Sequence, residues 1–202
     1  WEIGNKAADY ETLIRWWNQY ASKRPLIIGE DIERTVKFAD PLDQRSHQLP
    51  AKMRLHQQLH GVKGTVLWYA KAAVDNVGNY GTALRTNYWR NPALQPSMSF
   101  ISDKTPNKVS KVKPVWTEDG YFLFWTAPKG KDWKDLAVKY VVYRFAKGES
   151  VDINDPSKIM TITQSTYCKL PYQDGKHKYT YVVTALNRLQ NESKAVKKKV
   201  KL

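Results

Sequence analysis

Hydrophobic residues in the first half of the chain recur at the spacing of alternating helices and short buried strands. Residues 9–21 carry apolar side chains at helical spacing, with acidic residues near the start and Pro25 just beyond the end, which predicts a helix. The run Leu26-Ile27-Ile28 is short and wholly apolar. A strand of this kind is typical of a parallel sheet that is buried on both faces.

The same alternation continues as far as residue 90. Residues 30–48 are polar and are expected to form a loop. Residues 50–60 predict a second helix, residues 65–69 a second strand, and residues 80–88 a third helix. Strands and helices in alternation indicate an α/β architecture with a parallel sheet.

Beyond a stretch with linker composition at residues 96–114, the hydrophobic period changes to two. Apolar side chains alternate in three clear runs: Tyr121/Leu123/Trp125, Val138/Tyr140/Val142 and Tyr179/Tyr181/Val183/Ala185. Turn residues separate these runs, and several short strands in such a segment predict a β-sandwich. The predicted fold is therefore α/β plus all-β, with domains at residues 1–100 and 107–202.

Composition excludes few classes of protein. Eight Trp and twelve Tyr residues supply core area, but aromatic rings also stack on sugars and nucleobases, so they select no ligand. The lone Cys168 excludes an internal disulfide, and its place in an alternating run predicts a small core residue. No run of 18 apolar residues exists, so no membrane span is expected.

The net charge of +14 is concentrated in the second half of the chain. Residues 1–100 hold 13 Lys and Arg against 9 Asp and Glu, whereas residues 101–202 hold 20 against 10. Much of the excess lies near the C-terminus, at Lys194, Lys197, Lys198, Lys199 and Lys201. A basic half can bind a polyanion. The preferred interpretation is that these lysines line a solvated edge strand and discourage strand-to-strand aggregation.

Two segments of the second half resemble fibronectin type III domains. Leu123-Phe124-Trp125-Thr126-Ala127-Pro128 is similar to their second strand, whose Trp fills the core of the sandwich. Residues 179–187, followed by Asn191-Glu192-Ser193, are similar to their sixth strand and the turn after it. The resemblance implies a fibronectin type III-like β-sandwich with Trp125 in its core.

The first half resembles the end of the catalytic domain of glycosyl-hydrolase-like family 10, which comprises bacterial glycosidases built on a (β/α)8 TIM barrel. Six segments carry the resemblance in order: Trp1-Glu2-Ile3-Gly4, Ala8-Asp9-Tyr10, Arg15-Trp16-Trp17-Asn18, Ile28-Gly29-Glu30-Asp31, Gln48-Leu49-Pro50-Ala51-Lys52-Met53 and Tyr88-Trp89-Arg90-Asn91-Pro92-Ala93-Leu94. A whole barrel needs roughly 250 residues. The resemblance therefore implies the last two strands and three helices of a barrel whose N-terminal part is missing. On this reading the chain is a fragment of a longer precursor and lacks a complete active site.

Barrel active sites form at the C-terminal ends of the strands. The resemblance places Glu2 after the sixth strand and Glu30 and Asp31 after the seventh. Because glycoside hydrolysis needs two carboxyl groups across the scissile bond, these three are the predicted catalytic residues. The alternative is that Glu30 and Asp31 cap a turn and that Glu2 pairs with a nearby arginine.

Aromatic and basic residues near the same strand ends are candidates for binding a sugar. Trp1, Trp68 and Tyr69 are expected to stack on a sugar ring, and Arg34 to bind an acidic substituent. His56 and His60 stand four apart on a helix, as metal-binding histidines do, but no Glu follows His56 and no third ligand is evident. Their helix is expected on the outer ring of the barrel, away from the chemistry. Neither a metal nor a cofactor is expected.

The leading interpretation is a C-terminal fragment of a glycoside hydrolase that acts on a polysaccharide or a peptidoglycan-type glycan. Nucleic acid is not expected as a partner. Because secreted members of the family carry such a sandwich, the resemblance implies a parent protein that is secreted, periplasmic or displayed on the cell surface. The alternative is a binding module whose basic sandwich holds an anionic polymer without catalysis.

The predicted strands of the first half also suggest self-association. Two parallel strands without neighbours leave unpaired sheet edges and exposed apolar helix faces. Residues 1–95 are therefore expected to dock on the sandwich or on another copy of the chain.

Overall fold

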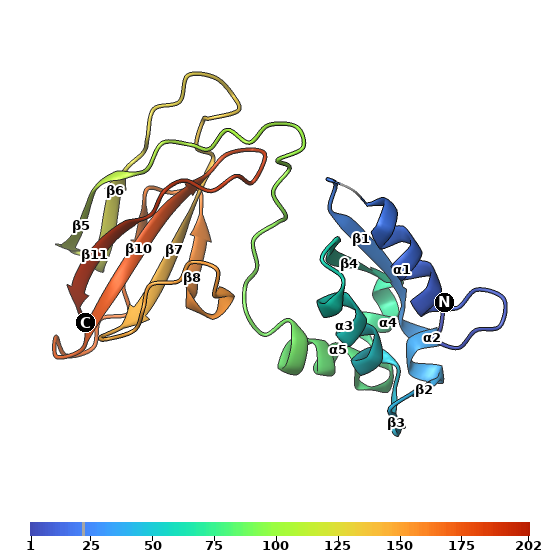
Figure 1. Cartoon of the computed structure of the whole chain (residues 1–202). Helices are drawn as coiled ribbons and strands as arrows, with labels where there is room; N and C mark the ends of the chain where they lie inside the picture. The colour runs from blue at the N-terminus through green and yellow to red at the C-terminus, as the bar shows by residue number, and fades with distance from the viewer. Residues whose placement is uncertain (22) are drawn as a thin grey trace. The chain divides into compact units, whose positions relative to one another are not determined.

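The chain divides into two compact units, residues 1–90 and residues 91–202, in a computed structural model that describes residues 1–21 and 23–202 (Figure 1). The first unit contains helices and two short sheets, and the second contains two larger antiparallel sheets. Within the described residues, no helix has the length and apolar character needed to cross a membrane.

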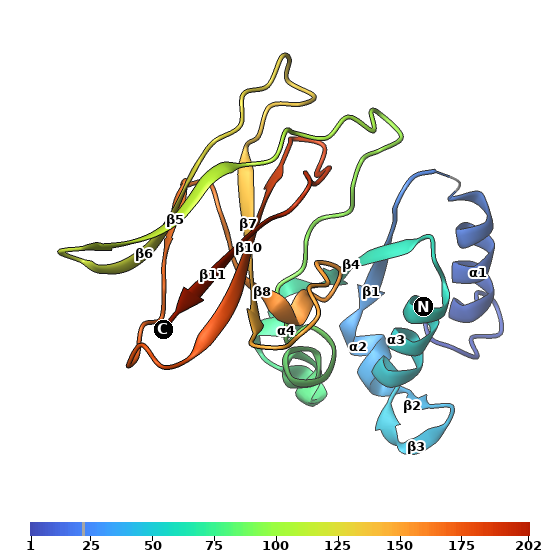
Figure 2. The same ribbon diagram turned by 60° about the vertical axis from the view of Figure 1, so that its left-hand side comes forward.

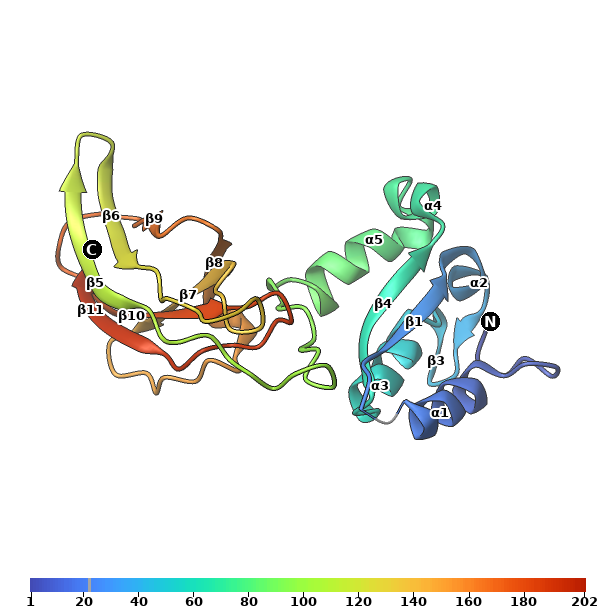
Figure 3. The same ribbon diagram turned by 90° about the horizontal axis from the view of Figure 1, so that it is seen from above.

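Two neighbouring parallel strands form the centre of the first unit. Strand β1 (Leu26–Asp31) pairs with β4 (Val62–Trp68), and their ends are in register where Asp31 lies opposite Trp68. Figure 3 shows the two strands running side by side in the same direction, with α1 and α3 beside them. The prediction of adjacent parallel strands near Ile27 and Val66 is confirmed, and both strands are longer than the sequence indicated.

Helices α1 (Tyr10–Tyr20) and α3 (Leu49–Gln58) confirm two further predictions. The Asp9 side chain caps α1 by accepting a hydrogen bond from the Thr12 backbone N–H at 2.9 Å. Pro50 stands in the first turn of α3, where its missing N–H costs no intrahelical bond. Both helices turn apolar side chains toward the parallel strands, among them Ile14 and Leu55.

The prediction of a loop at residues 30–48 is wrong. Helix α2 (Ile32–Lys37) follows β1 directly, and a small hairpin of β2 (Ala39–Asp40) and β3 (Asp43–His47) follows α2. The helix buries only two side chains, so its apolar period was too short to recognise. It forms because the Asp31 side chain caps it, accepting from the Arg34 backbone N–H at 3.0 Å.

The third predicted helix, residues 80–88, corresponds to α5 (Tyr80–Ala83) and the π-helical turn η2 (Leu84–Tyr88) that follows it. Two short pieces that were not predicted precede it, α4 (Ala70–Val74) and η1 (Val77–Asn79). Asn76, Gly78 and Asn79 have positive φ angles, which interrupt a right-handed helix. At Gly78 (φ 55°) an added Cβ would lie 2.3 Å from Val36 Cγ1, so the break also reflects close packing onto α2.

Seven strands form the two sheets of the second unit (Figure 2). One sheet has the order β5-β6-β9, with bounds Ser110–Thr117, Gly120–Thr126 and Tyr167–Lys169. The other has the order β11-β10-β7-β8, with bounds Val196–Lys201, Lys178–Leu186, Lys139–Ala146 and Ile159–Thr163. A single turn of 3-10 helix, η3 (Pro156–Lys158), leads into β8. The three alternating runs found in the sequence all map to these strands.

The core of this unit confirms two predictions about single residues. Trp125 is 5% exposed and meets the Tyr140 ring edge-on at 5.5 Å between centroids. Cys168 is buried in the same cluster, and burial raises the pKa of its thiol to about 11. It is therefore a small apolar core residue.

Residues 96–109 are part of the second unit and pack against its strands and turns despite their linker composition. Val109 is almost completely buried, and the Met98 backbone N–H donates to the Leu189 carbonyl at 2.8 Å. The Asn191 side-chain amide donates to the carbonyls of Ser102 and Lys104 at 2.7 and 2.9 Å. A residue nearly ninety positions away thus orders this segment, which local composition could not reveal.

The basic C-terminal segment forms an edge strand, as predicted. Strand β11 pairs only with β10 in its sheet and alternates inward Val196 and Val200 with exposed lysines. Such lysines keep an unpaired sheet edge in water.

Candidate active site

The parallel strand pair has one face covered by helices and one that carries exposed apolar side chains. On the covered face, Ile28 packs with residues of α1 and α3, and Leu67 packs with the cluster around Leu49. On the other face, Ile27 and Val66 are 46% and 59% exposed. Because side chains alternate along a strand, Glu30 falls on the helix side and Asp31 on the open side.

Glu30 is completely buried and is bound by a lysine from α3. Lys52 Nζ lies 2.9 Å from Glu30 Oε2, and both side chains have no exposed surface. The same ammonium group donates to the Trp1 carbonyl at 2.9 Å and to Thr35 Oγ1 at 2.8 Å. An ammonium group has three N–H donors, so each of them has a partner.

The other oxygen of Glu30 binds two more residues. Tyr10 donates its hydroxyl to Oε1, and His56 Nε2 lies 3.2 Å from the same atom. Helix α3 therefore turns His56 onto Glu30, a contact that the sequence did not indicate. His60, by contrast, is exposed. Across residues 1–21 and 23–202, no three His, Cys, Asp or Glu side chains group as a metal site would require.

The electrostatics of this cluster hold Glu30 in its charged form. Burial is the largest influence and by itself raises the pKa of the Glu30 carboxyl. The hydrogen bond from His56, the charge of Lys52 and the hydrogen bond from Tyr10 outweigh it, so the pKa lies below its ordinary value. Burial and the Glu30 charge raise the pKa of Tyr10, which stays protonated and able to donate.

Arg34 connects the two carboxylates that lie toward the open side. Its Nη1 is 3.2 Å from Glu2 Oε2, and its Nε is 3.7 Å from Asp31 Oδ2. The guanidinium group also lies over the Trp1 ring, 4.8 Å from the centroid. The alternative interpretation is therefore present in part: Asp31 caps α2 and Glu2 pairs with an arginine, whereas Glu30 binds Lys52 instead of capping a turn. Neither contact moves Asp31 from the carboxyl end of β1, where it lies opposite Trp68.

Glu2 is held in its charged form as well. The Asn5 side-chain amide donates to Glu2 Oε1 at 2.5 Å, and this bond is the largest cause of a lowered pKa. Burial opposes the effect and the Arg34 contact adds to it. A carboxyl group with a lowered pKa is ionised at neutral pH, which is the form that a base or a nucleophile requires.

The two aromatic residues at the end of β4 extend into solvent. Trp68 is 69% exposed and lies opposite Asp31 in the strand register, and Tyr69 is 40% exposed. The peptide bond between them is cis. Asp31, Arg34 and Trp68 thus belong to one rim, whereas Glu30 lies behind it.

Sequence reasoning missed the residues that hold this rim in place. Gln48 forms two hydrogen bonds with the backbone of Ile3, at 2.7 and 2.9 Å, and so fixes the segment that carries Glu2. Lys52 fixes the adjacent Trp1 carbonyl. One signal was available, because Lys52 stands on the apolar stripe of its helix with Leu49 and Leu59. A charged residue on such a stripe predicts a buried partner of opposite charge.

Comparison with known proteins supports a relationship to glycosyl hydrolases. No protein-family model matches the chain. It is 31% identical over 204 residues to a protein named "Glycosyl hydrolase YngK" from Bacillus subtilis (strain 168), and the match spans the whole chain but 39% of that relative. The name agrees with the glycosyl-hydrolase part of the resemblance found in the sequence.

Solved structures give only weak likenesses. The spore cortex lytic enzyme SleM of Clostridium perfringens is 15% identical, covering 48% of this chain and 28% of its own, with a TM-score of 0.33. The glycoside hydrolase domain of Endo-D from Streptococcus pneumoniae R6 is 19% identical, covering 48% and 15%, with a TM-score of 0.29. A structure titled FN3tt mut is 19% identical, covering 48% and 93%, with a TM-score of 0.32. None of these likenesses bears on function.

Proposed function

We propose that residues 1–90 are the C-terminal part of the (β/α)8 barrel of a longer glycoside hydrolase, with β1 and β4 as its seventh and eighth strands. The parallel pairing of β1 and β4 supports this, as does the placement of helices on one face alone. So does the name of the relative, of which this chain spans 39%. The observation that carries the proposal is the rim where Asp31 lies at the carboxyl end of β1, opposite Trp68 and linked to Glu2 through Arg34.

Within that site Asp31 and Glu2 are the catalytic carboxyls. Glycoside hydrolysis uses one carboxyl group as the acid and the other as the base or nucleophile. The lowered pKa keeps Glu2 ionised, as the base or nucleophile must be, and Asp31 is the second carboxyl of the pair in the assembled enzyme. Arg34 holds both groups near one guanidinium and lays its own plane on Trp1.

Trp1, Trp68 and Tyr69 supply surfaces on which a sugar ring stacks. Glu30, first predicted as a third catalytic acid, is proposed as a positioning residue, because it faces the helices and reaches no solvent. It organises Lys52, which in turn holds the backbone of Trp1.

Three finer assignments belong to the same proposal. They are membership in glycosyl-hydrolase-like family 10, the fibronectin type III-like character of the sandwich, and a parent protein that is secreted, periplasmic or on the cell surface. The two antiparallel sheets around a Trp-containing core support the second assignment.

The proposal is tested by hydrolysis. The protein that includes the coding sequence upstream of Trp1 is expected to release reducing ends from at least one polysaccharide or peptidoglycan preparation. The 202-residue chain is expected to release none, since two strands cannot enclose a barrel active site. A longer protein that hydrolyses no glycan, or equal activity in the short chain, would contradict the proposal.

A further inference from the structure

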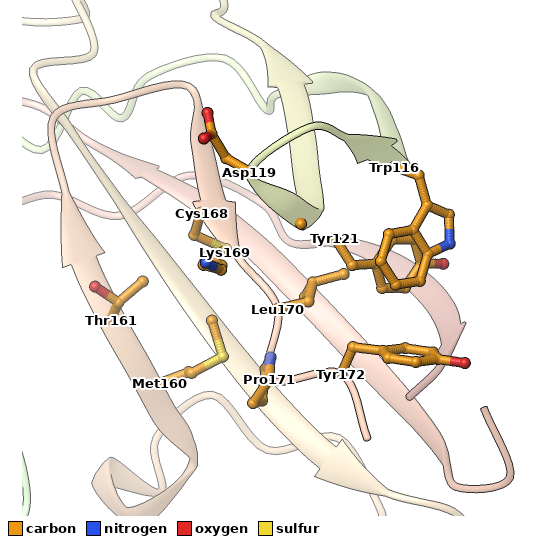
Figure 4. Close-up of a pocket in the computed structure, with 11 residues that line it drawn as sticks. Trp116, Asp119, Tyr121, Met160, Thr161, Cys168, Lys169, Leu170, Pro171 and Tyr172 are labelled. Carbon is orange, nitrogen blue, oxygen red and sulfur yellow. The ribbon is translucent and has the colours of Figure 1, made fainter. Parts of the chain in front are cut away.

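A second group of exposed aromatic residues lies on the sandwich, in the unit that carries no proposed catalytic residue. Trp116, Tyr121 and Tyr172 border a hollow of about 680 Å³, which is termed the aromatic groove here (Figure 4). Two open sheet edges, β9 and β8, form its flanks, and the buried Leu170 lies at its base.

The three rings form one rigid surface. Trp116 and Tyr121 are cross-strand partners of the β5–β6 hairpin and stack with centroids 4.7 Å apart and an interplanar angle of 21°. Tyr172, from the segment after β9, meets the Trp116 ring edge-on at 4.8 Å. In Figure 4 the indole overlies the Tyr121 ring, and Tyr172 lies beside the pair. A ring held on one side by a stack presents its other face to a ligand at little entropic cost.

Exposure distinguishes this group from the core beneath it. Trp116 is 59% exposed and Tyr172 is 43% exposed, whereas Leu170 and Cys168 below them are buried. Hairpin stabilisation explains the Trp116–Tyr121 contact. It does not explain why a third aromatic residue extends the surface along an open groove.

The charged side chains that line the groove give it a net charge near zero. Asp119 and Lys169 contribute one charge of each sign, and Thr161 adds a hydroxyl group. Among the described residues, the side chains of Asp119 and Thr161 form no hydrogen bond or ion pair with another protein group, so both are available to a ligand. The lysine-rich strand β11 lies at the edge of its sheet opposite to β8 and lines no part of the groove. The groove therefore lacks the positive charge that a nucleic acid or an acidic glycan requires.

We propose that the aromatic groove binds a neutral polysaccharide, with one pyranose ring stacked on Trp116 and with Asp119 and Thr161 bonding hydroxyls elsewhere along the polymer. Apolar ring faces combined with a few polar groups match the two kinds of surface that a sugar presents. The inference rests on the proposed function only for the choice of polysaccharides as the ligand class. It assigns the sandwich a binding role of its own.

The test is affinity electrophoresis of the whole 202-residue chain in native gels run for a basic protein, since its pI is about 9.7. The gels contain xylan, mixed-linkage β-glucan, glucomannan or soluble starch. At least one polymer is expected to retard the chain. Trp116→Ala is expected to weaken the affinity obtained from that retardation at least tenfold, as truncation of a central aromatic contact does. Trp133→Ala is the matched control, because Trp133 is 49% exposed in the same unit and is no part of the groove. It is expected to behave as the native chain.

Thermal melting separates binding from folding. If Trp116→Ala unfolds the sandwich, Tyr172→Ala replaces it, because Tyr172 lies outside the paired strands. Retardation by none of the four polymers would overturn the proposal, as would equal retardation of the folded Trp116 or Tyr172 variants. Retention on heparin or single-stranded DNA alone, lost in salt, would assign binding to the lysine-rich strand instead. Hydrolysis by the longer protein is a separate measurement, so failure of either proposal is recognised independently.

Discussion

Replacing Lys52 by Met tests the buried charge cluster that holds the proposed site in place. The substitution leaves Glu30 charged and buried, with Tyr10 and His56 as its remaining partners. Breaking a buried ion pair by removing one member costs roughly 3–5 kcal/mol. We expect the lower end, about 3 kcal/mol, because Tyr10 and His56, whose Nε2 lies 3.2 Å from the same carboxylate, remain as partners.

The loss of stability depends on pH in a defined direction. In the native chain the pKa of Glu30 lies below its ordinary value of 4.5, so its stabilising effect is present above that pH and is lost as pH falls through the folded-state pKa. Without Lys52, burial dominates and raises that pKa, so the charged form destabilises the fold at neutral pH. The difference between the two proteins is therefore expected to be largest near pH 7. It shrinks as the pH falls through the raised Glu30 pKa of the variant and on toward the lowered Glu30 pKa of the native chain.

The assay is calorimetry of the whole chain. A loss of about 3 kcal/mol lowers the Tm of a unit of this size by at least about 12 °C. The transition of the sandwich serves as an internal control and is expected to stay in place. Lys71→Met is the matched substitution, because Lys71 forms an ion pair with Asp75 that water screens, so its loss is expected to leave the Tm almost unchanged.

A double variant separates charge burial from simple loss of packing. Glu30→Gln combined with Lys52→Met removes both charges and is expected to be at least about 1 kcal/mol more stable at pH 7 than Lys52→Met alone. A loss of less than about 1 kcal/mol in the free energy of unfolding of Lys52→Met would refute the charge-burial explanation. So would a double variant that recovers none of the lost free energy.

Three further predictions concern individual positions. Gly78→Ala is expected to destabilise the first unit by about 2 kcal/mol or more in urea unfolding, because its φ is positive and Val36 occupies the space of the new methyl group. Gly148→Ala also has a positive φ but open space around it, and is expected to cost about 1 kcal/mol. Equal losses in the two variants would contradict this. Asn191→Ala is expected to speed amide hydrogen exchange at residues 98–105, and unchanged exchange by mass spectrometry would show that its bonds to Ser102 and Lys104 do not order that segment. Native Cys168 is expected to resist iodoacetamide at pH 8, because burial raises its pKa to about 11, and labelling as fast as in urea would contradict its place in the core.

The sequence predicted those elements whose apolar pattern runs over several turns or strands. Helix α1 was found because Asp9 caps a long periodic stretch, and the sandwich strands because inward and outward side chains alternate. Helix α2 was missed because it is held by the Asp31 cap and buries only two side chains. The two pieces before the third predicted helix, α4 and η1, were missed because they are short and are separated by the left-handed residue Asn76. Gly78 in η1 packs on Val36 of α2, which lies far back in the sequence.

The sequence predicted which types of residue lie at the strand ends, but not which face of β1 each of them occupies. Acidic and aromatic residues were expected at the strand ends, and Asp31 and Trp68 do lie opposite each other there. Their division into two faces could not be predicted, because β1 was expected to end before Glu30. Once the strand extends to Asp31, alternation alone sends Glu30 toward the helices and Asp31 toward the open face.

The most direct test of the proposed function is the hydrolysis rate of the longer protein carrying Asp31→Asn. Asparagine also caps helices well, so α2 is retained and the Tm is expected to change little. We predict that Asp31→Asn lowers kcat on the responsive glycan at least about a hundredfold. Asp43→Asn, which alters an exposed ion pair on the β2–β3 hairpin, is expected to keep the native rate. Native activity in the Asp31 variant would show that the rim of β1 and β4 does not carry the chemistry.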